Sequence, residues 1–126
     1  MRYIGMAFIS LCSVLCAATA DNKMDAVQVA PNVYKVVFEN ERVRVLGFVT
    51  EPGQKWPLHS HPDRVAISLS DYSVRNIIPG QDPTERHSKL GDVHWISATS
   101  HIGENTGSTG STEMRGLIVE LKEPRP

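Results

Sequence analysis

After Asp21, hydrophobic residues fall in short runs, several of which alternate with polar residues, and no long stretch repeats with the period of a helix. Alternating runs of about four to eight residues are typical of β-strands. The pattern predicts eight strands, over residues 33–38, 43–50, 54–61, 64–70, 73–77, 84–90, 93–97 and 114–122. Eight short strands predict an all-β fold, either a sandwich or a small barrel.

Turn-forming residues separate most of these strands. They are Glu-Pro-Gly at 51–53, Pro-Gly-Gln-Asp-Pro at 79–83, Leu-Gly-Asp at 90–92 and Asn-Thr-Gly at 105–107. We expect residues 21–30 to lie loosely against the body of the protein. The small residues at 107–112 are expected to form a loop.

Residues 1–20 have the pattern of a signal peptide. Arg2 carries a positive charge, residues 4–15 are nearly all apolar, and the segment ends in Ala-Thr-Ala, which resembles a signal-peptidase site. The apolar run is shorter than the roughly 20 residues that a membrane-spanning helix needs. We therefore expect cleavage near Ala20, no stable membrane anchor afterwards, one domain over residues 21–126, and a periplasmic or secreted protein.

Composition and charge narrow the possible partners. A chain of 126 residues with 21% charged and 40% hydrophobic residues is ordinary for one soluble domain. The formal net charge of −1 gives no reason to expect binding to nucleic acid. Cys12 and Cys16 both fall in the expected signal peptide, so the remaining chain would fold without a disulfide.

His59 and His61 are the most informative polar residues. If residues 55–61 are extended, side chains two positions apart point to the same face, so both histidines can turn inward. Two imidazoles make half of a metal site. A third nitrogen from a strand remote in sequence would complete a facial triad with open positions for water or substrate. His101 is the best candidate for that third ligand.

Two motifs in order carry a family resemblance. Gly53 stands six residues before the His-Ser-His run, and Gly91 begins a Gly-Asp segment that passes Trp95 and continues to His101 and Asn105. Within a short all-β chain, this combination resembles a small single-domain cupin. The resemblance implies a double-stranded β-helix, or jelly-roll barrel, with a site in its mouth or interior and frequently a homodimer. It also implies that His59, His61 and His101 are metal ligands.

One departure from the cupin pattern concerns the metal. The first motif of the family usually supplies a glutamate four residues after its second histidine, and here that residue is Val65. The site would then lack its only carboxylate, and a divalent cation would keep its full charge and attract an anionic substrate or hydroxide. Three-histidine cupin sites with ferrous iron are known, and three imidazoles also suit zinc. Iron, zinc, manganese and nickel all stay open.

Four other residues are candidates for the site. His94 shares a strand face with Ile96, so it is either a fourth ligand, a general acid or base, or an outward residue in a dimer sheet. Asp63 would orient a ligand histidine or cap the neighbouring turn, and Arg64 would neutralise a substrate carboxylate. Asn105 is expected to shape its turn or to bond the backbone rather than to touch a metal.

These residues favour a metal-dependent enzyme that acts on a small molecule, for which the charge of the site would favour an anion. The reaction would resemble that of a dioxygenase, lyase or isomerase. The alternatives are a non-catalytic periplasmic module that binds a small ligand, and an accessory barrel that has lost its chemistry. Because one fold carries many functions, the sequence leaves open whether the protein is an enzyme.

Overall fold

The computed structural model describes residues 24–107 and 113–123. These residues form one short helix and nine strands: α1 (Ala26–Val29), β1 (Tyr34–Glu39), β2 (Val43–Thr50), β3 (Lys55–His61), β4 (Arg64–Ser68), β5 (Tyr72–Ile77), β6 (Thr84–Ser88), β7 (Val93–Ile96), β8 (Thr99–Asn105) and β9 (Met114–Leu121). The strands pair in two antiparallel sheets, in the orders β1-β2-β9-β4-β7 and β3-β8-β5-β6. The prediction of an all-β fold is confirmed.

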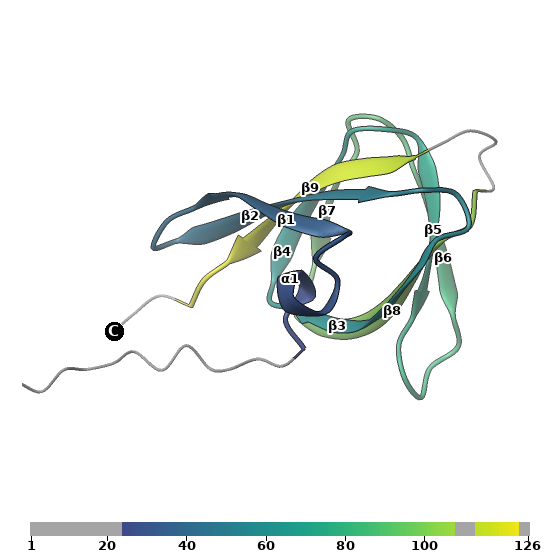
Figure 1. Cartoon of the computed structure of the whole chain (residues 1–126), viewed down its shortest axis with the longest axis horizontal. Helices are drawn as coiled ribbons and strands as arrows, with labels where there is room; N and C mark the ends of the chain where they lie inside the picture. The colour runs from purple at the N-terminus through teal and green to yellow at the C-terminus, as the bar shows by residue number, and fades with distance from the viewer. Residues whose placement is uncertain (1–23, 108–112, 124–126) are drawn as a thin grey trace, which may run out of the picture.

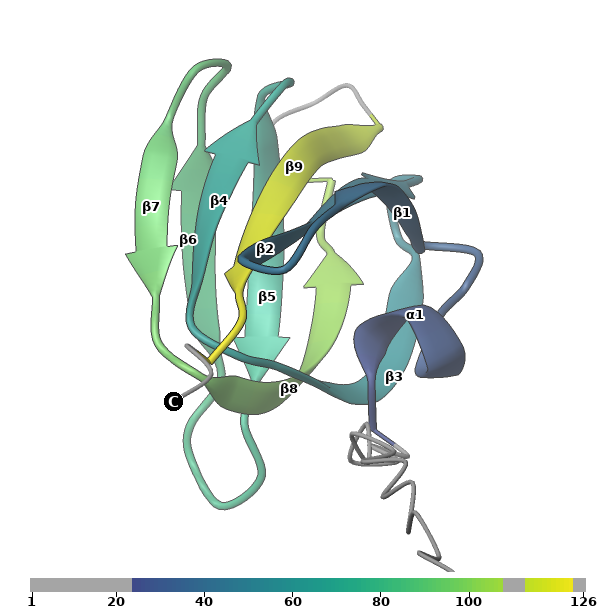
Figure 2. The same ribbon diagram turned by 90° about the vertical axis from the view of Figure 1, so that its left-hand side faces the viewer.

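The two sheets face each other and enclose the core (Figure 1). Figure 2 shows β7 and β4 in front of β6 and β5. Side chains alternate between the interior and the outside, as the pleat of a strand requires. On β9, for example, Met114, Gly116, Ile118 and Glu120 are the buried residues. The interior is therefore apolar for the most part, but it also contains a carboxylate.

Two glycines allow aromatic rings to pack closely against the sheets. Gly103 on β8 lies under the indole of Trp56, and Gly116 on β9 lies under the ring of Phe48. A Cβ atom at either glycine would overlap the ring above it. Both rings belong to the buried hydrophobic core, so these glycines fix how the inner wall of the barrel is packed.

The sequence pattern does not predict β8, although this strand carries His101. The segment has polar residues or glycine at its buried positions and runs into a turn, so its hydrophobic alternation is weak. It is a strand because His101, Gly103 and Asn105 face the interior and because it pairs with both β3 and β5. Because polar residues of this strand line the barrel, its sequence lacks the alternation of hydrophobic and polar residues that predicts a strand.

The expectation that residues 21–30 lie loosely is wrong for the part that the structure describes. Ala26 and Ala30 have no exposed surface. The Asp25 carboxylate caps α1 by accepting a hydrogen bond from the backbone N–H of Val27 at 3.2 Å. The N–H of Ser60 donates to the carbonyl of Met24 at 2.6 Å, which fastens this segment to β3. Figure 2 shows α1 beside β1 and β3.

The expected signal peptide, residues 1–20, and most of the expected loop at 107–112 lie outside the described residues. Within residues 24–107 and 113–123, no helix has the length and apolar character needed to cross a membrane.

Candidate metal centre

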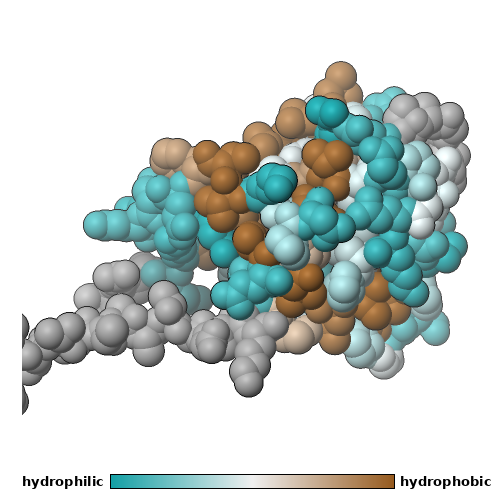
Figure 3. All heavy atoms as spheres, in the orientation of Figure 1, coloured by the Kyte–Doolittle hydropathy of each residue, from teal (hydrophilic) through white to brown (hydrophobic). Residues whose placement is uncertain are grey.

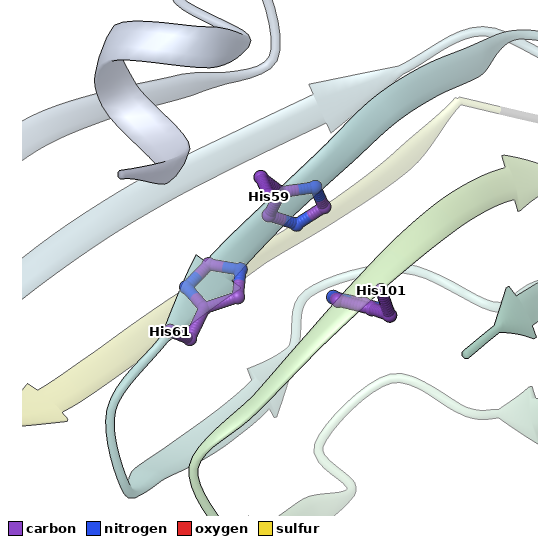
Figure 4. A group of neighbouring side chains, drawn as sticks. All are labelled: His59, His61 and His101. Atoms are coloured by element: carbon purple, nitrogen blue, oxygen red, sulfur yellow. The ribbon is translucent and has the colours of Figure 1, made fainter. Parts of the chain in front are cut away.

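His59 and His61 lie on β3 and His101 lies on the neighbouring strand β8, where it is the register partner of His59. Figure 4 shows the three rings facing one another. Each offers a ring nitrogen that lies within 4.8 Å of the other two, and all three residues are buried. The structure thus brings together the three histidines named from the sequence, and they could hold a metal ion.

Each histidine is oriented by an oxygen atom at its Nδ1. The Nδ1 of His59 lies 2.7 Å from the carbonyl oxygen of Pro57, that of His61 lies 2.9 Å from a carboxylate oxygen of Glu120, and that of His101 lies 2.9 Å from the amide oxygen of Asn76. Because these oxygens accept hydrogen bonds, each Nδ1 carries the proton and each Nε2 keeps its lone pair. Outer hydrogen bonds of this kind are typical of metal-ligating histidines.

Two of the three Nε2 atoms in the cluster have no partner among the described residues. Those of His61 and His101 are buried and have no hydrogen-bond partner. An unpaired buried acceptor costs free energy, so native proteins rarely leave two of them side by side. A cation between them would satisfy both lone pairs, and the residues present therefore fit a metal ion.

Burial also keeps the imidazoles in the form that binds metals. It lowers the pKa of His59 to about 4 and that of His101 to about 2. Burial lowers the pKa of His61 as well, although its hydrogen bond to Glu120 acts in the opposite direction. At neutral pH all three rings are uncharged, so no proton has to leave before a metal binds.

Glu120 links the histidine cluster to the N-terminal segment. One of its carboxylate oxygens bonds to His61, and the other accepts a hydrogen bond from Arg44 at 2.7 Å. Arg44 in turn contacts the Asp25 carboxylate at 2.5 Å. Burial alone would raise the pKa of Glu120, but the hydrogen bonds from His61 and Arg44 outweigh it and lower that pKa. The carboxylate is therefore ionised beside the cluster.

The group of described residues that could share a metal contains no carboxylate, but Glu120 places one behind it, at the Nδ1 of His61. Val65 belongs to the outward face of β4, whose buried residues are Arg64, Ala66 and Ser68. The sequence contains a signal for Glu120 that the pattern analysis misses: it is a charged residue two positions after the inward Ile118.

Tyr34 and Trp56 support the remaining histidine. The indole N–H of Trp56 donates to the Tyr34 hydroxyl at 3.0 Å, and that hydroxyl lies 3.1 Å from the Nε2 of His59. Because the Nδ1 of His59 holds the proton, the tyrosine donates to Nε2. Burial raises the pKa of Tyr34, which keeps this donor protonated. Neither aromatic residue is assigned to the site by the sequence pattern.

A cavity of about 50 Å³ adjoins the cluster and is lined by His61, His101 and residues of the core. A second pocket of about 140 Å³ shares His101 and Arg64 with the first. Arg86, which the sequence analysis does not name, lines both spaces. The histidine cluster is therefore adjacent to space for water or a small molecule.

The structure places His94 on the same side of β7 as Ile96, opposite Ala66 of β4, and its Nε2 is buried without a partner. His94 is not part of the group of three that could share a metal. The structure therefore does not support it as a fourth ligand.

Asp63 and Asn105 both bond the backbone. The Asp63 carboxylate accepts from the N–H of Ala98 at 2.7 Å, with no bond to a histidine among the described residues. Asn105 donates to the carbonyl of Thr50 at 3.3 Å and accepts from the N–H of Gly107 at 3.1 Å, so it holds its turn.

Similar solved structures carry the same fold. A cupin-domain protein from Bordetella pertussis Tohama I has a TM-score of 0.64 and 22% identity, covering 72% of this chain and 93% of that chain. An RmlC-like cupin family protein with a double-stranded β-helix fold from Methanocaldococcus jannaschii has a TM-score of 0.52 and 17% identity, covering 71% of this chain and 78% of that chain. The polyketide cyclase RemF from Streptomyces resistomycificus has a TM-score of 0.54 and 20% identity, covering 74% of this chain and 66% of that chain.

No protein-family model and no curated protein matches the chain. The structural likenesses show that the chain has the double-stranded β-helix fold of cupin-domain proteins, which is the jelly-roll barrel that the sequence motifs imply.

Proposed function

We propose that the protein is a metal-dependent enzyme that acts on a small molecule, with His59, His61 and His101 as its metal ligands. The observation that carries this proposal is the arrangement of the ring nitrogens. Every Nδ1 is held by an oxygen acceptor, and two buried Nε2 lone pairs have no partner. Neutral imidazoles with fixed tautomers suit iron, zinc, manganese and nickel.

A divalent ion held by these residues would supply Lewis-acid chemistry or, if it were iron, chemistry with molecular oxygen. The reaction class is that of a dioxygenase, lyase or isomerase. The fold supports an enzyme because RemF, a polyketide cyclase, shares it. That likeness does not extend to the substrate.

The chain's own residues would orient the ligands and offer a proton donor. Glu120 would hold the Nδ1 proton of His61 and thereby fix the direction of its Nε2 lone pair. When the Nε2 of His59 ligates a metal ion, the Tyr34 hydroxyl would no longer donate to that nitrogen and could donate a hydrogen bond to a substrate oxygen instead. Trp56 would keep that hydroxyl in place through its indole N–H.

Substitution of single histidines tests the proposed metal site. His61→Ala should abolish metal uptake, because it removes one of three ligands and leaves Glu120 buried without that partner. His87→Ala is the matched control, because His87 is exposed on β6 and contacts Ser73 rather than the cluster. Equal loss of metal in both variants, measured by elemental analysis, would contradict the assignment.

We also propose export to the periplasm or the medium, on the evidence of the pattern in residues 1–20. The intact mass of protein recovered from the producing cells should correspond to a chain that begins near Asp21. A mass that retains all of residues 1–20 would contradict export by cleavage.

A homodimer formed through the outer face of the five-stranded sheet completes the proposal. A row of apolar residues crosses all five strands in register: Phe38, Val45, Val119, Val65 and Trp95. Phe38 is 54% exposed and Trp95 is 57% exposed. Figure 3 shows hydrophobic residues gathered on the surface where β1 and β2 lie in Figure 1. An apolar face is complementary to a second copy of itself, which a two-fold dimer requires.

A further inference from the structure

We infer that Arg64 and Arg86 form an anion subsite beside the histidine cluster, and that this subsite binds the carboxylate of a small organic acid. The inference rests on the proposed function, because it names the class of substrate on which the proposed enzyme acts. The two arginines come from opposite sheets, Arg64 from β4 and Arg86 from β6. Both line the cavity of about 50 Å³ and the pocket of about 140 Å³.

Arg64 is a buried cation that lacks an anionic partner. It is 2% exposed, and its guanidinium makes long contacts, at 3.4 Å, with the carbonyl oxygens of Pro62 and Ser97. Among the described residues, no carboxylate forms an ion pair with it. Burial lowers the pKa of Arg64 to about 10, so the group is still charged at neutral pH. A buried charge without a counter-ion is costly, and an anionic ligand would remove that cost.

Arg86 brings a second positive charge to the same pocket. It is half-buried on the inward face of β6, and within the described part of the chain it forms neither an ion pair nor a hydrogen bond with a side chain. The charge of Arg86 acts against that of Arg64, as expected of two cations that face one space. Glu120 and Asp63 offset part of the charge of Arg64, but neither forms an ion pair with it. Two cations that face one space are tolerated most readily where an anion binds between them.

The rest of the pocket suits a small acid rather than a large one. Its volume of about 140 Å³ is well below the roughly 300 Å³ at which sites for drug-sized ligands begin. Polar Asn76, Thr84 and Thr99 and apolar Ile78 and Ile96 complete its wall. His101 belongs both to this wall and to the histidine cluster, so a carboxylate held by the arginines would lie in a space that borders the candidate metal centre.

The test measures binding rather than turnover. The full chain, freed of metal by chelation, is titrated with propionate, with its neutral isostere propionamide and with inorganic phosphate, and unfolding temperature and calorimetric affinity are recorded. We expect propionate alone to bind and stabilise the wild type. Arg86→Gln should weaken this binding by about tenfold or more, because it removes a charge-assisted hydrogen bond. Equal effects of propionate and propionamide, or a preference for phosphate, would overturn the inference.

Arg75→Gln is the matched control, because Arg75 is an exposed arginine on β5 that pairs with Glu104 at 3.3 Å and lines neither space. It should bind propionate as the wild type does. If Arg86→Gln also binds propionate with wild-type affinity, the subsite is wrong. Arg64→Gln gives a second test of the same kind, with circular dichroism to confirm that the variant folds.

Reconstitution of the same preparations with metal, followed by elemental analysis, separates this inference from the proposed function. Propionate binding that depends on the arginines, in a protein that takes up no metal, would keep the subsite and overturn the metal-dependent enzyme. Metal uptake without propionate binding would overturn the subsite alone.

Discussion

Glu120 shows how a single buried residue can control the histidine cluster. Its two oxygens join His61 to Arg44, so that the orientation of a candidate ligand depends on a charge network that ends at Asp25. Breaking a buried pair leaves an uncompensated charge and is usually more costly than the pair is worth. The network therefore couples the packing of the N-terminal segment to the site.

Glu120→Gln should weaken metal binding by about 10–100-fold, the usual effect of losing a partner that orients a ligating histidine. The measurement is a competition titration with a coloured chelator. Glu104→Gln, which changes a surface carboxylate paired with Arg75, should leave the affinity unchanged. Equal affinities for wild type and Glu120→Gln would show that the carboxylate does not orient His61.

The metal-free protein should lose stability as the pH falls from about 6.5 toward 4. The pKa of His59 is lowered to about 4 and that of His101 to about 2, whereas both titrate near 6.5 in the unfolded chain. Below pH 6.5 the unfolded chain binds protons that the folded chain does not, so unfolding becomes more favourable. Above pH 6.5 these groups add no further pH dependence.

Denaturant titrations at about pH 5 and about pH 7.5 measure this difference. His101→Gln should reduce it, and His87→Ala should not. A free energy of unfolding that is the same at both pH values in the wild type would contradict the assignment of buried, neutral histidines.

At the scale of residues, the sequence predicts the three histidines but not the residues that orient them. The spacing of His59 and His61 on an extended segment is a local property, and it survives in the structure. Glu120, Asn76 and Tyr34 reach the cluster from other strands, and nothing in the sequence tells which strands are neighbours. Arg86 is missed for the same reason.

At the scale of elements, β8 carries both the candidate ligand His101 and Gly103, against which the Trp56 ring packs. Gly103 lies under Trp56, Trp56 donates to Tyr34, and Tyr34 donates to His59. Gly103, two residues after His101, therefore also affects His59 on the neighbouring strand β3.

Gly103→Ala should destabilise the protein by about 1–3 kcal/mol, because the added methyl group overlaps the Trp56 ring in a packed interior. Denaturant unfolding measures this effect. Ser100→Ala, at an exposed position of the same strand, should change the stability by less than about 0.5 kcal/mol. Equal effects of the two substitutions would contradict the packing account.

Strands with apolar alternation are predictable from sequence, and β2 and β9 match their predicted ranges closely. β8 is not predictable in this way, because it lines the barrel with polar groups. Neither is α1, which is only four residues long. Their existence depends on contacts with β3 that the local sequence does not encode.

At the scale of the whole molecule, the two outer faces of the barrel differ. The five-stranded sheet presents Trp95 and Phe38 to solvent, whereas the four-stranded sheet presents Lys55, Ser100 and Arg75. Large exposed apolar patches usually mark interfaces. Of these two faces as described, the first is therefore the one that fits the proposed dimer.

Trp95→Asp should shift the protein from dimer to monomer in light scattering, because it places a charge in the proposed interface. Arg75→Gln, on the polar face, should leave the mass unchanged. A wild type that is monomeric at all concentrations would contradict the proposed dimer.

The central claim, that His59, His61 and His101 hold a divalent metal ion, is tested most directly by elemental analysis of the wild type. The protein is purified anaerobically without chelator, and metal per chain is measured by plasma mass spectrometry. We predict close to one iron, zinc, manganese or nickel ion per chain. Absence of metal, even after reconstitution with each of these ions, would contradict the account.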